Sequence, residues 1–224
     1  MKAKLLDLIE AGRQKEAEVL LPHVDDSAPP RAGQWTVKDT VANLMSWRRI
    51  AIAELDSVRT GREAPMVADE DDDQNAMFYT QTRDMPARAV LQSAAKSWDD
   101  FAEAVEACTE EHLQAGRPQH PETKVLLVVP QNAIDQVAVH VEHWYADHGD
   151  PAAEEAAALW RYEVNFQAFS DDRRRGIQEY MLGRFYASKG RLEEASSRLG
   201  RALALRPELR EFATKDPALA KLLN

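Results

Sequence analysis

Three of the chain's six histidines lie in the stretch 135–148, DQVAVHVEHWYADH. On a helix of about 3.6 residues per turn, five of its side chains fall within less than half of the circumference. They are His140, His143, Trp144, Asp147 and His148. Imidazoles and a carboxylate on one face suit a borderline metal such as zinc or nickel, and they also suit general acid–base chemistry. A plain amphipathic helix with hydrated histidines gives the same pattern, because the chain has no HExxH or paired-cysteine motif.

The composition is that of an ordinary globular chain, with 44% hydrophobic and 29% charged residues over 224 positions. The formal net charge of −10 argues against nucleic acid and against an anionic membrane surface as partners. The single cysteine, Cys108, excludes an internal disulfide and is expected to be a buried apolar residue. No apolar run approaches the roughly 20 residues of a membrane span, and the first residues turn polar too early for a secretory signal. We therefore expect a cytoplasmic protein.

Apolar residues recur with the helical period in four long segments. These segments are 2–21, 34–58, 86–108 and 131–148. Thr36 is expected to cap the second helix with Asp39 as the acid of a capping box, and Gly149 is expected to end the fourth. The acidic stretch 61–76 is expected to be a solvated loop, and 124–130, KVLLVVP, an extended lead-in to the fourth helix. Four such helices with one long crossing loop predict an all-α four-helix bundle.

The second helix carries a polar side chain beside an aromatic one, because Asn43 and Trp47 are four residues apart. An amide next to an indole on an inward face suggests the wall of a pocket. An asparagine that merely joins two helices by hydrogen bonds would show the same spacing. The sequence leaves both interpretations open.

Two phrases of the chain resemble a known superfamily. WTVKDTVANLMSW, residues 35–47, resembles the second-helix signature of the DinB-like superfamily: a Trp, a small cap, Val-Lys-Asp and an Ala-His-Leu triplet. The stretch 73–113 is similar to the ClbS/DfsB branch, in which an Asn, a Tyr and an Arg lead into the third helix and a Glu-Glu-x-Leu phrase ends it. The resemblance covers about residues 1–150 and implies a four-helix bundle with a pocket between its helices.

The resemblance also implies a metal site. Many DinB-like proteins hold a divalent metal with one histidine of the second helix and two of the fourth. The matching positions here are Asn43, His143 and Asp147, so one of the three is a histidine. Asp147 can ligate zinc, whereas a neutral amide is a poor substitute for imidazole. The expected ligands of zinc or nickel are therefore His143, Asp147 and His140.

The ClbS/DfsB branch includes proteins that protect their host from a reactive small molecule by hydrolytic opening of a strained ring. The resemblance therefore implies a small-molecule-binding protein, with a hydrolase or resistance factor as the expected activity. The candidate catalytic residues are His143 and Tyr79. The candidate substrate-binding residues are Asn43, Trp47 and Trp144.

The last third of the chain resembles a different family. After a predicted linking helix at 151–169, residues 179–212 match a tetratricopeptide repeat. The matching residues are Leu182, Gly183, Tyr186, Gly190, Ala195, Leu199, Ala202 and Pro207. We therefore expect two domains, 1–150 and 151–224. The alternative function is a non-catalytic binding or scaffolding protein that uses the repeat to bind a protein partner or to form a homodimer.

A single repeat cannot bury both of its faces, since stable arrays need about three. Several leucines of the repeat and of the tail are therefore expected to need a covering surface outside the repeat, in cis or in trans. They are Leu203, Leu205, Leu209, Leu219, Leu222 and Leu223.

Overall fold

The computed structural model describes residues 1–25, 35–64, 66–68 and 70–223. These residues form two compact units that divide at Gly149, one residue from the boundary expected from the sequence. Regular secondary structure in the described residues is helical throughout and includes no β-strand, which confirms the all-α class. None of the described helices combines the length and the apolarity needed to cross a bilayer. The two units are taken separately below.

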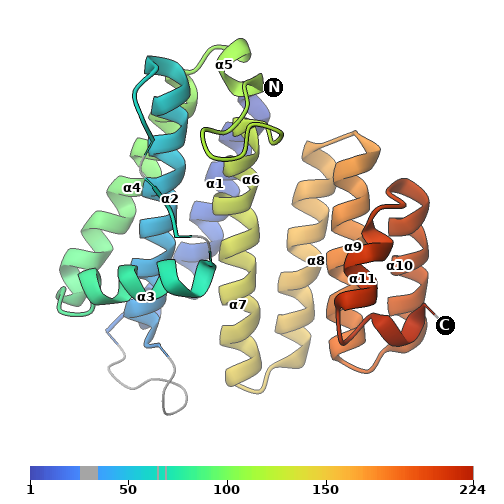
Figure 1. Ribbon diagram of the computed structural model, residues 1–224. Coiled ribbons are helices and arrows are strands. Elements are labelled where there is room, and N and C mark those ends of the chain that lie inside the picture. Colours follow the sequence, from blue (N-terminus) through green and yellow to red (C-terminus); the bar gives the residue numbers. More distant parts are fainter. Residues whose placement is uncertain (26–34, 65, 69, 224) are drawn as a thin grey trace. The chain divides into compact units, whose positions relative to one another are not determined.

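The N-terminal unit, residues 1–149, consists of long helices joined by shorter helical pieces (Figure 1). The longest helices are α1 (Lys2–Val19), α2 (Val37–Thr60) and α4 (Ala87–Ala107), while α3 (Asp71–Thr82) and α7 (Gln136–Asp147) have 12 residues each. The shorter pieces are η1 (Leu21–His23), α5 (Glu110–Gln114), η2 (Val125–Leu127), α6 (Val128–Pro130) and η3 (Gln131–Asp135). The α2 helix packs against α4 and α3, while α1 packs against α4 and η3.

The local signals at the helix ends are confirmed. Thr36 and Asp39 form the predicted capping box, in which Thr36 Oγ1 accepts from Asp39 N at 3.2 Å and Asp39 Oδ2 accepts from Thr36 N at 3.1 Å. Gly61 follows α2 with φ +71° and Gly149 follows α7 with φ +69°. Glycine suits both positions because other residues pay a steric penalty in the left-handed region.

The prediction of a loop over 61–76 is wrong from Asp71 onward, where α3 begins. Three aspartates occupy the first turn of α3, and negative charge there interacts favourably with the positive end of the helix. Tertiary contacts also hold this helix, since Gln74 and Phe78 are buried and Gln74 Oε1 accepts from Ala68 N at 2.9 Å. The acidic side chains themselves are exposed, as expected for a solvated charge run.

The predicted extended lead-in at 124–130 is also wrong, because the chain is helical from Val125 onward. Val128 and Val129 are fully buried, so core packing outweighs the preference of β-branched residues for strands. Pro130 cannot donate a backbone hydrogen bond, and the wider π-type turn of η3 follows it directly. Within that turn Asn132 Nδ2 donates to the carbonyl oxygen of Val128 at 2.8 Å.

A buried ion pair joins α1, α2 and α4. Glu16 and Arg48 have side chains that are both 0% exposed, and Arg48 donates from Nη1 and Nη2 to the two carboxylate oxygens at 2.7 and 3.2 Å. Arg48 Nε donates to Ser97 Oγ at 2.9 Å, and the guanidinium lies 4.0 Å from the ring centroid of Trp98. Trp98 Nε1 in turn donates to Glu16 at 3.2 Å. Burial lowers the pKa of Arg48, and the Glu16 carboxylate opposes that change.

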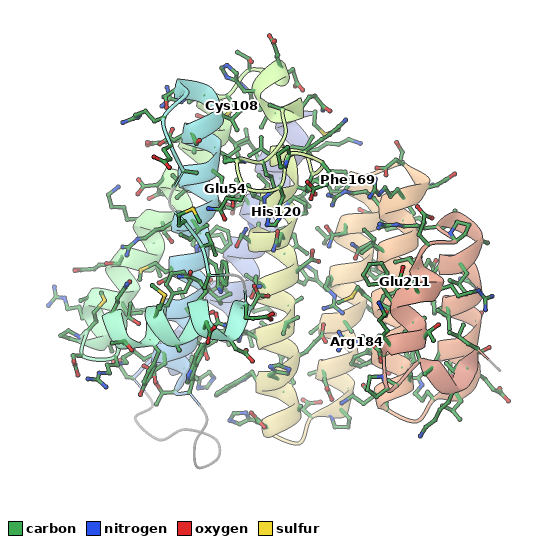
Figure 2. The ribbon with its side chains drawn as sticks, in the orientation of Figure 1. Glu54, Cys108, His120, Phe169, Arg184 and Glu211 are labelled. Carbon is green, nitrogen blue, oxygen red and sulfur yellow. The ribbon has the colours of Figure 1, made fainter. Side chains whose placement is uncertain are left out.

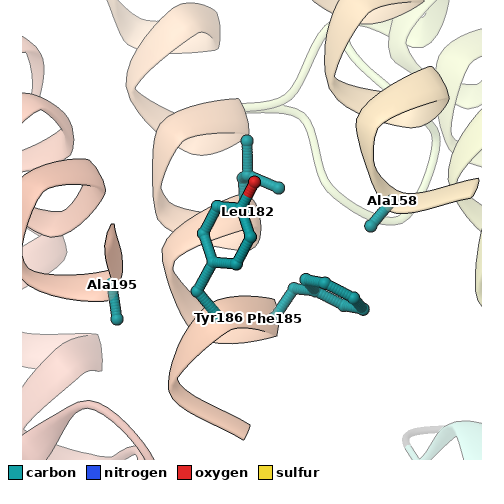
Figure 3. Packing of buried hydrophobic residues seen from close by; sticks show 5 residues of the cluster. All are labelled: Ala158, Leu182, Phe185, Tyr186 and Ala195. Atoms are coloured by element: carbon teal, nitrogen blue, oxygen red, sulfur yellow. The ribbon is translucent and has the colours of Figure 1, made fainter. Parts of the chain in front are cut away.

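The C-terminal unit begins at Asp150. Its helices are α8 (Pro151–Ala168), α9 (Asp172–Ser188), α10 (Leu192–Leu205), α11 (Leu209–Lys215) and η4 (Ala220–Leu222). The α9 helix packs against both α10 and α8, and Figure 3 shows Leu182, Phe185 and Tyr186 of α9 with Ala195 of α10 and Ala158 of α8. Five of the residues that match the repeat should pack against each other if the resemblance holds, and all five are buried. They are Leu182, Tyr186, Ala195, Leu199 and Ala202.

The expectation that the C-terminal leucines need cover from outside the repeat is wrong for most of them. Leu219 is 0% exposed in a cluster with Leu199 and Ala213. Leu203, Leu222 and Leu223 pack against the same cluster, and Leu209 is 5% exposed. The tail that follows α10 therefore covers the second face of the helical pair.

We predict that removing one partner of the buried ion pair lowers the free energy of unfolding more than removing both partners does. Arg48→Met strands the Glu16 carboxylate in the core and should lower the free energy of unfolding by about 3–5 kcal/mol. The double variant Glu16→Leu/Arg48→Met should lose less than this single variant, because no buried charge is left unpaired. Urea unfolding measures both.

The matched control for the ion pair is Arg13→Ala. Arg13 Nη1 lies 2.7 Å from Asp99 Oδ1 and also links α1 to α4, but both side chains are largely exposed. An exposed pair of this kind contributes below about 1 kcal/mol. A loss for Arg48→Met no larger than the loss for Arg13→Ala would contradict the role given to the buried pair.

Candidate functional site

The histidines of α7 share the helix but do not converge on one point. The buried residues of α7 are Val137, Ala138 and Val141. His143 lies two positions beyond Val141, about 200° around the helix, and its side chain is exposed. The metal site implied by the resemblance would need His143 to face the interior opposite Asn43, and this placement is wrong because Asn43 is buried and His143 is exposed.

The expected metal ligands do not form a coordination set in this arrangement. The rings of His140 and His143 are 6.4 Å apart, centroid to centroid, and nearly perpendicular. Among the described residues, no group of three His, Cys, Asp or Glu side chains is arranged to hold a metal ion. Asp147 is partly buried one turn beyond His143.

The most unusual ionisable group on α7 is His140. Burial, and to a smaller extent the neighbouring His143, lowers the pKa of His140 from 6.5 to about 4. The imidazole is therefore neutral at neutral pH and keeps a free lone pair for a proton or a metal. It cannot serve there as an imidazolium acid.

Trp144 makes its ring contacts with two imidazoles. Its ring centroid lies 4.5 Å from that of His23 in η1 and 3.7 Å from that of His148 at the end of α7. His148 Nδ1 also lies 2.7 Å from the carbonyl oxygen of Trp144. The expected substrate-binding indole is thus part of a histidine–tryptophan stack that includes His23, which was not predicted as a site residue.

Asn43 and Trp47 do meet, through a residue of α3. Asn75 Oδ1 accepts from Asn43 Nδ2 at 2.8 Å and from Trp47 Nε1 at 2.9 Å. Trp47 also packs edge-to-face on Phe78 at 5.3 Å between ring centroids. The amide of Asn43 therefore joins two helices, and Trp47 belongs to the same buried polar–aromatic cluster.

Tyr79 follows Asn75 by one helical turn, but it lies at the surface. It is 38% exposed and stacks parallel to Trp35 at 6.2 Å between ring centroids. The structure thus brings Asn43 and Trp47 together, places Tyr79 one turn from their shared acceptor, and leaves His143 exposed on another helix.

Cys108 and Glu54 of the N-terminal unit have side chains that could take part in chemistry, but both are held in structural roles (Figure 2). Cys108 is 1% exposed, as expected, and burial raises the pKa of its thiol, so it is a poor nucleophile. Glu54 accepts from Nε and Nη2 of Arg117, both at 2.7 Å, which ties the segment after α5 to α2.

The C-terminal unit carries a surface hollow of about 490 Å³. Six side chains line it: Tyr186, Glu193, Glu194, Ser197, Arg198 and Arg201. All but Tyr186 come from one side of α10. No short motif marks these residues, and the only sequence signal was the match of Tyr186 to the repeat.

A tyrosine, a glutamate and an arginine hold one wall of the hollow. Tyr162 Oη donates to Glu179 Oε1 at 2.9 Å, and Arg198 Nη1 donates to Glu179 Oε2 at 3.1 Å. The guanidinium of Arg198 lies 4.8 Å from the ring centroid of Tyr162. Burial, followed by the Glu179 carboxylate, raises the pKa of Tyr162, so its phenol stays protonated.

A second cluster of the same three residue types fixes Tyr186. Its hydroxyl donates to Glu155 Oε1 at 3.3 Å, and Arg191 Nη1 lies 2.7 Å from Glu155 Oε2. The guanidinium of Arg191 lies 4.5 Å from the Tyr186 ring centroid. The members of this cluster come from α8, α9 and the residues before α10, so Tyr186 is held in place before a ligand binds, as Arg198 is by Glu179.

Scans against protein-family models, curated proteins and solved structures found no match to this chain. The chemistry of these side chains is therefore the basis for assigning a function.

We predict that His140 makes the N-terminal unit acid-sensitive. In the unfolded chain its pKa returns to about 6.5. Between pH 6.5 and 4 the unfolded state binds more protons, so the free energy of unfolding falls as the pH falls, by about 1–3 kcal/mol. His140→Gln should remove this part of the pH dependence in urea unfolding.

The matched control for this pH dependence is His120→Gln. Its side chain is 60% exposed, so the substitution should leave the pH dependence unchanged. Equal acid sensitivity of the wild type and of His140→Gln would contradict the role of His140.

Proposed function

We propose that this chain is a non-catalytic binding protein and that the hollow on α10 holds a segment of a polypeptide partner. The observation that carries the proposal is the hollow itself, with about 490 Å³ of space against a lining of mixed charge. Pockets for drug-sized ligands have similar volumes but are mostly apolar. The hydroxyl, carboxylate and guanidinium groups of this lining can instead form hydrogen bonds with the polar backbone and side chains of a peptide.

The fixed lining supports this proposal. Ordering flexible side chains on binding costs free energy, and a site arranged in advance avoids that cost. Arg198 and Tyr186 are each held by a glutamate from another helix before any partner arrives. Tyrosine and arginine are also the residue types that most often dominate binding energy in protein interfaces.

The tetratricopeptide-like pattern in residues 179–212 agrees with such a role. Repeats of this family bind partners through their helical surfaces. In this chain the tail after α10 covers one face of the helical pair, so the other face is the one open to a partner. The same pattern is the reason to expect that the C-terminal unit associates with a protein partner.

The proposal is tested by filling the hollow with a bulky side chain and measuring peptide binding. A phage-displayed library of random peptides is panned against the full-length protein, and the selected peptides are titrated against Ser197→Trp. Ser197 lines the hollow, so a tryptophan there should weaken binding about tenfold or more. Fluorescence anisotropy with the labelled peptides measures the change.

Ser196→Trp is the matched control, because Ser196 is exposed on α10 and does not line the hollow. This variant should bind like the wild type. Failure to select any peptide, or equal loss in both variants, would overturn the proposal. Light scattering of the same proteins shows whether the partner is a second copy of this chain.

A second proposal concerns the N-terminal unit, and it is supported by the amide of Asn75. Its Oδ1 accepts both hydrogen bonds of the cluster, and no acceptor for its Nδ2 is found among the described residues. We propose that this Nδ2 donates to an oxygen of a small-molecule ligand beside Trp47 and Tyr79. In this proposal the chain is a small-molecule-binding protein, and a detoxifying hydrolase of the DinB-like type is the activity that the resemblance implies.

The measurements for this second proposal are a metal analysis of untagged protein and a titration with zinc and with nickel. His140, His143 and Asp147 would have to turn toward one another to bind either ion. About one ion per chain, lost in His143→Ala but kept in His120→Ala, would support the proposal. Protein that neither contains nor binds zinc or nickel would remove the metal-dependent form of it.

A further inference from the structure

The hollow on α10 contains two charged groups that are left over after the others pair. Glu194 is 2.8 Å from Arg191, and Arg198 is 3.1 Å from Glu179. Within the described part of the chain, Glu193 makes no ion pair or hydrogen bond. Arg201, the remaining charged residue of the lining, is likewise without such a contact there.

These two charges lie at opposite ends of the hollow. Glu193 is in the first turn of α10, and Arg201 is eight positions later. At about 1.5 Å per residue, eight positions correspond to about 12 Å along the helix. Ser197 lies midway between them and lines the same hollow. The hollow therefore presents a negative group at one end and a positive group at the other.

We infer that the hollow selects an extended polypeptide segment with a basic and an acidic side chain four residues apart. This inference rests on the proposed peptide-binding function. An extended chain advances about 3.3 Å per residue, so four residues span about 13 Å. Side chains four apart in an extended chain also point to the same side. The basic side chain faces Glu193, and the acidic one faces Arg201.

The chemistry of the two ends favours this pairing. A guanidinium binds a carboxylate through two parallel hydrogen bonds, so Arg201 suits an aspartate or glutamate. A ligand with two basic or two acidic groups would pair with one end and be repelled by the other. The charges already paired in the lining, Arg198 and Glu194, do not change this pattern.

Glu193 also suits the dipole of α10, because an acid in the first turn of a helix is favourable. That structural role predicts a change in stability only. A role in ligand selection predicts that a charge reversal changes which peptide binds most tightly. Such a change of preference distinguishes ligand selection from helix stabilisation.

The experiment uses three synthetic peptides that share one extended scaffold and differ at two positions four residues apart. The two positions are Lys and Glu, Lys and Lys, or Glu and Glu. Fluorescence anisotropy with the full-length protein should show the Lys/Glu peptide binding about tenfold more tightly than either of the others. Salt should reduce this difference, since the groups are exposed.

Charge reversal then switches the preference. Glu193→Lys makes both ends positive and should make the Glu/Glu peptide the tightest ligand, while Arg201→Glu should favour the Lys/Lys peptide. Glu211→Lys is the matched control, because Glu211 lies on α11 and does not line the hollow (Figure 2). This control should keep the wild-type order, and thermal unfolding of all variants checks that each one is folded.

An unchanged order of the three peptides in Glu193→Lys and Arg201→Glu would overturn the inference. If peptides selected by panning still lose affinity in Ser197→Trp, the proposed function stands and only the charge rule fails. If no peptide binding depends on the hollow, both fail.

Discussion

The N-terminal unit depends on a complete pairing of two buried charges. Taking one carboxylate and one guanidinium out of water costs several kcal/mol for each group, and good geometry must offset that cost. Glu16 and Arg48 meet this requirement because Ser97 and Trp98 occupy the donor and acceptor positions that the pair leaves open. A shift of α1 or α2 along its axis would leave a buried charge unpaired, and a shift of α4 would remove the hydrogen bonds of Ser97 and Trp98, so the pairing fixes how these helices align.

The same alignment brings α1 close to the bent start of the last helix of the unit. A Cβ at Gly12 would lie 2.0 Å from the carbonyl oxygen of Ala133, so only glycine fits this approach. Ala133 belongs to the π-type turn that follows Pro130. The proline, the wide turn and the glycine are therefore packed together. Their packing determines which side of α7 faces the interior.

This dependence explains which features the sequence could predict. The capping box at Thr36 and the glycine that ends α7 rest on residues a few positions apart, and both are found. The start of α3 and the helix from Val125 depend on burial against distant segments, which a local pattern does not contain. The face of α7 was misassigned because histidine spacing is the same whichever side packs inward.

The same contrast between local and distant contacts explains which parts of the candidate sites could be predicted. Asn43 and Trp47 were recognised as a pair because they are one turn apart on a single helix. Their common acceptor, Asn75, was missed because it is 32 positions from Asn43 and on another helix. The hollow of the C-terminal unit was missed because its lining consists of ordinary charged surface residues. Only their fixed partners in α8 and α9 distinguish them from any exposed helix.

Charge is distributed unevenly between the two units, and this bears on how the hollow discriminates. Residues 150–224 contain 13 Lys and Arg against 12 Asp and Glu, so residues 1–149 hold the other 15 Lys and Arg and 26 Asp and Glu, a net charge of −11. A nearly neutral C-terminal unit exerts little long-range attraction on ligands of either sign. Its selectivity must then come from where individual charges lie, and two of the four charged residues in the hollow, Glu194 and Arg198, are already neutralised by a partner within hydrogen-bond distance. The two that remain, Glu193 in the first turn of α10 and Arg201 eight positions later, are therefore the groups through which this unit can distinguish one peptide from another.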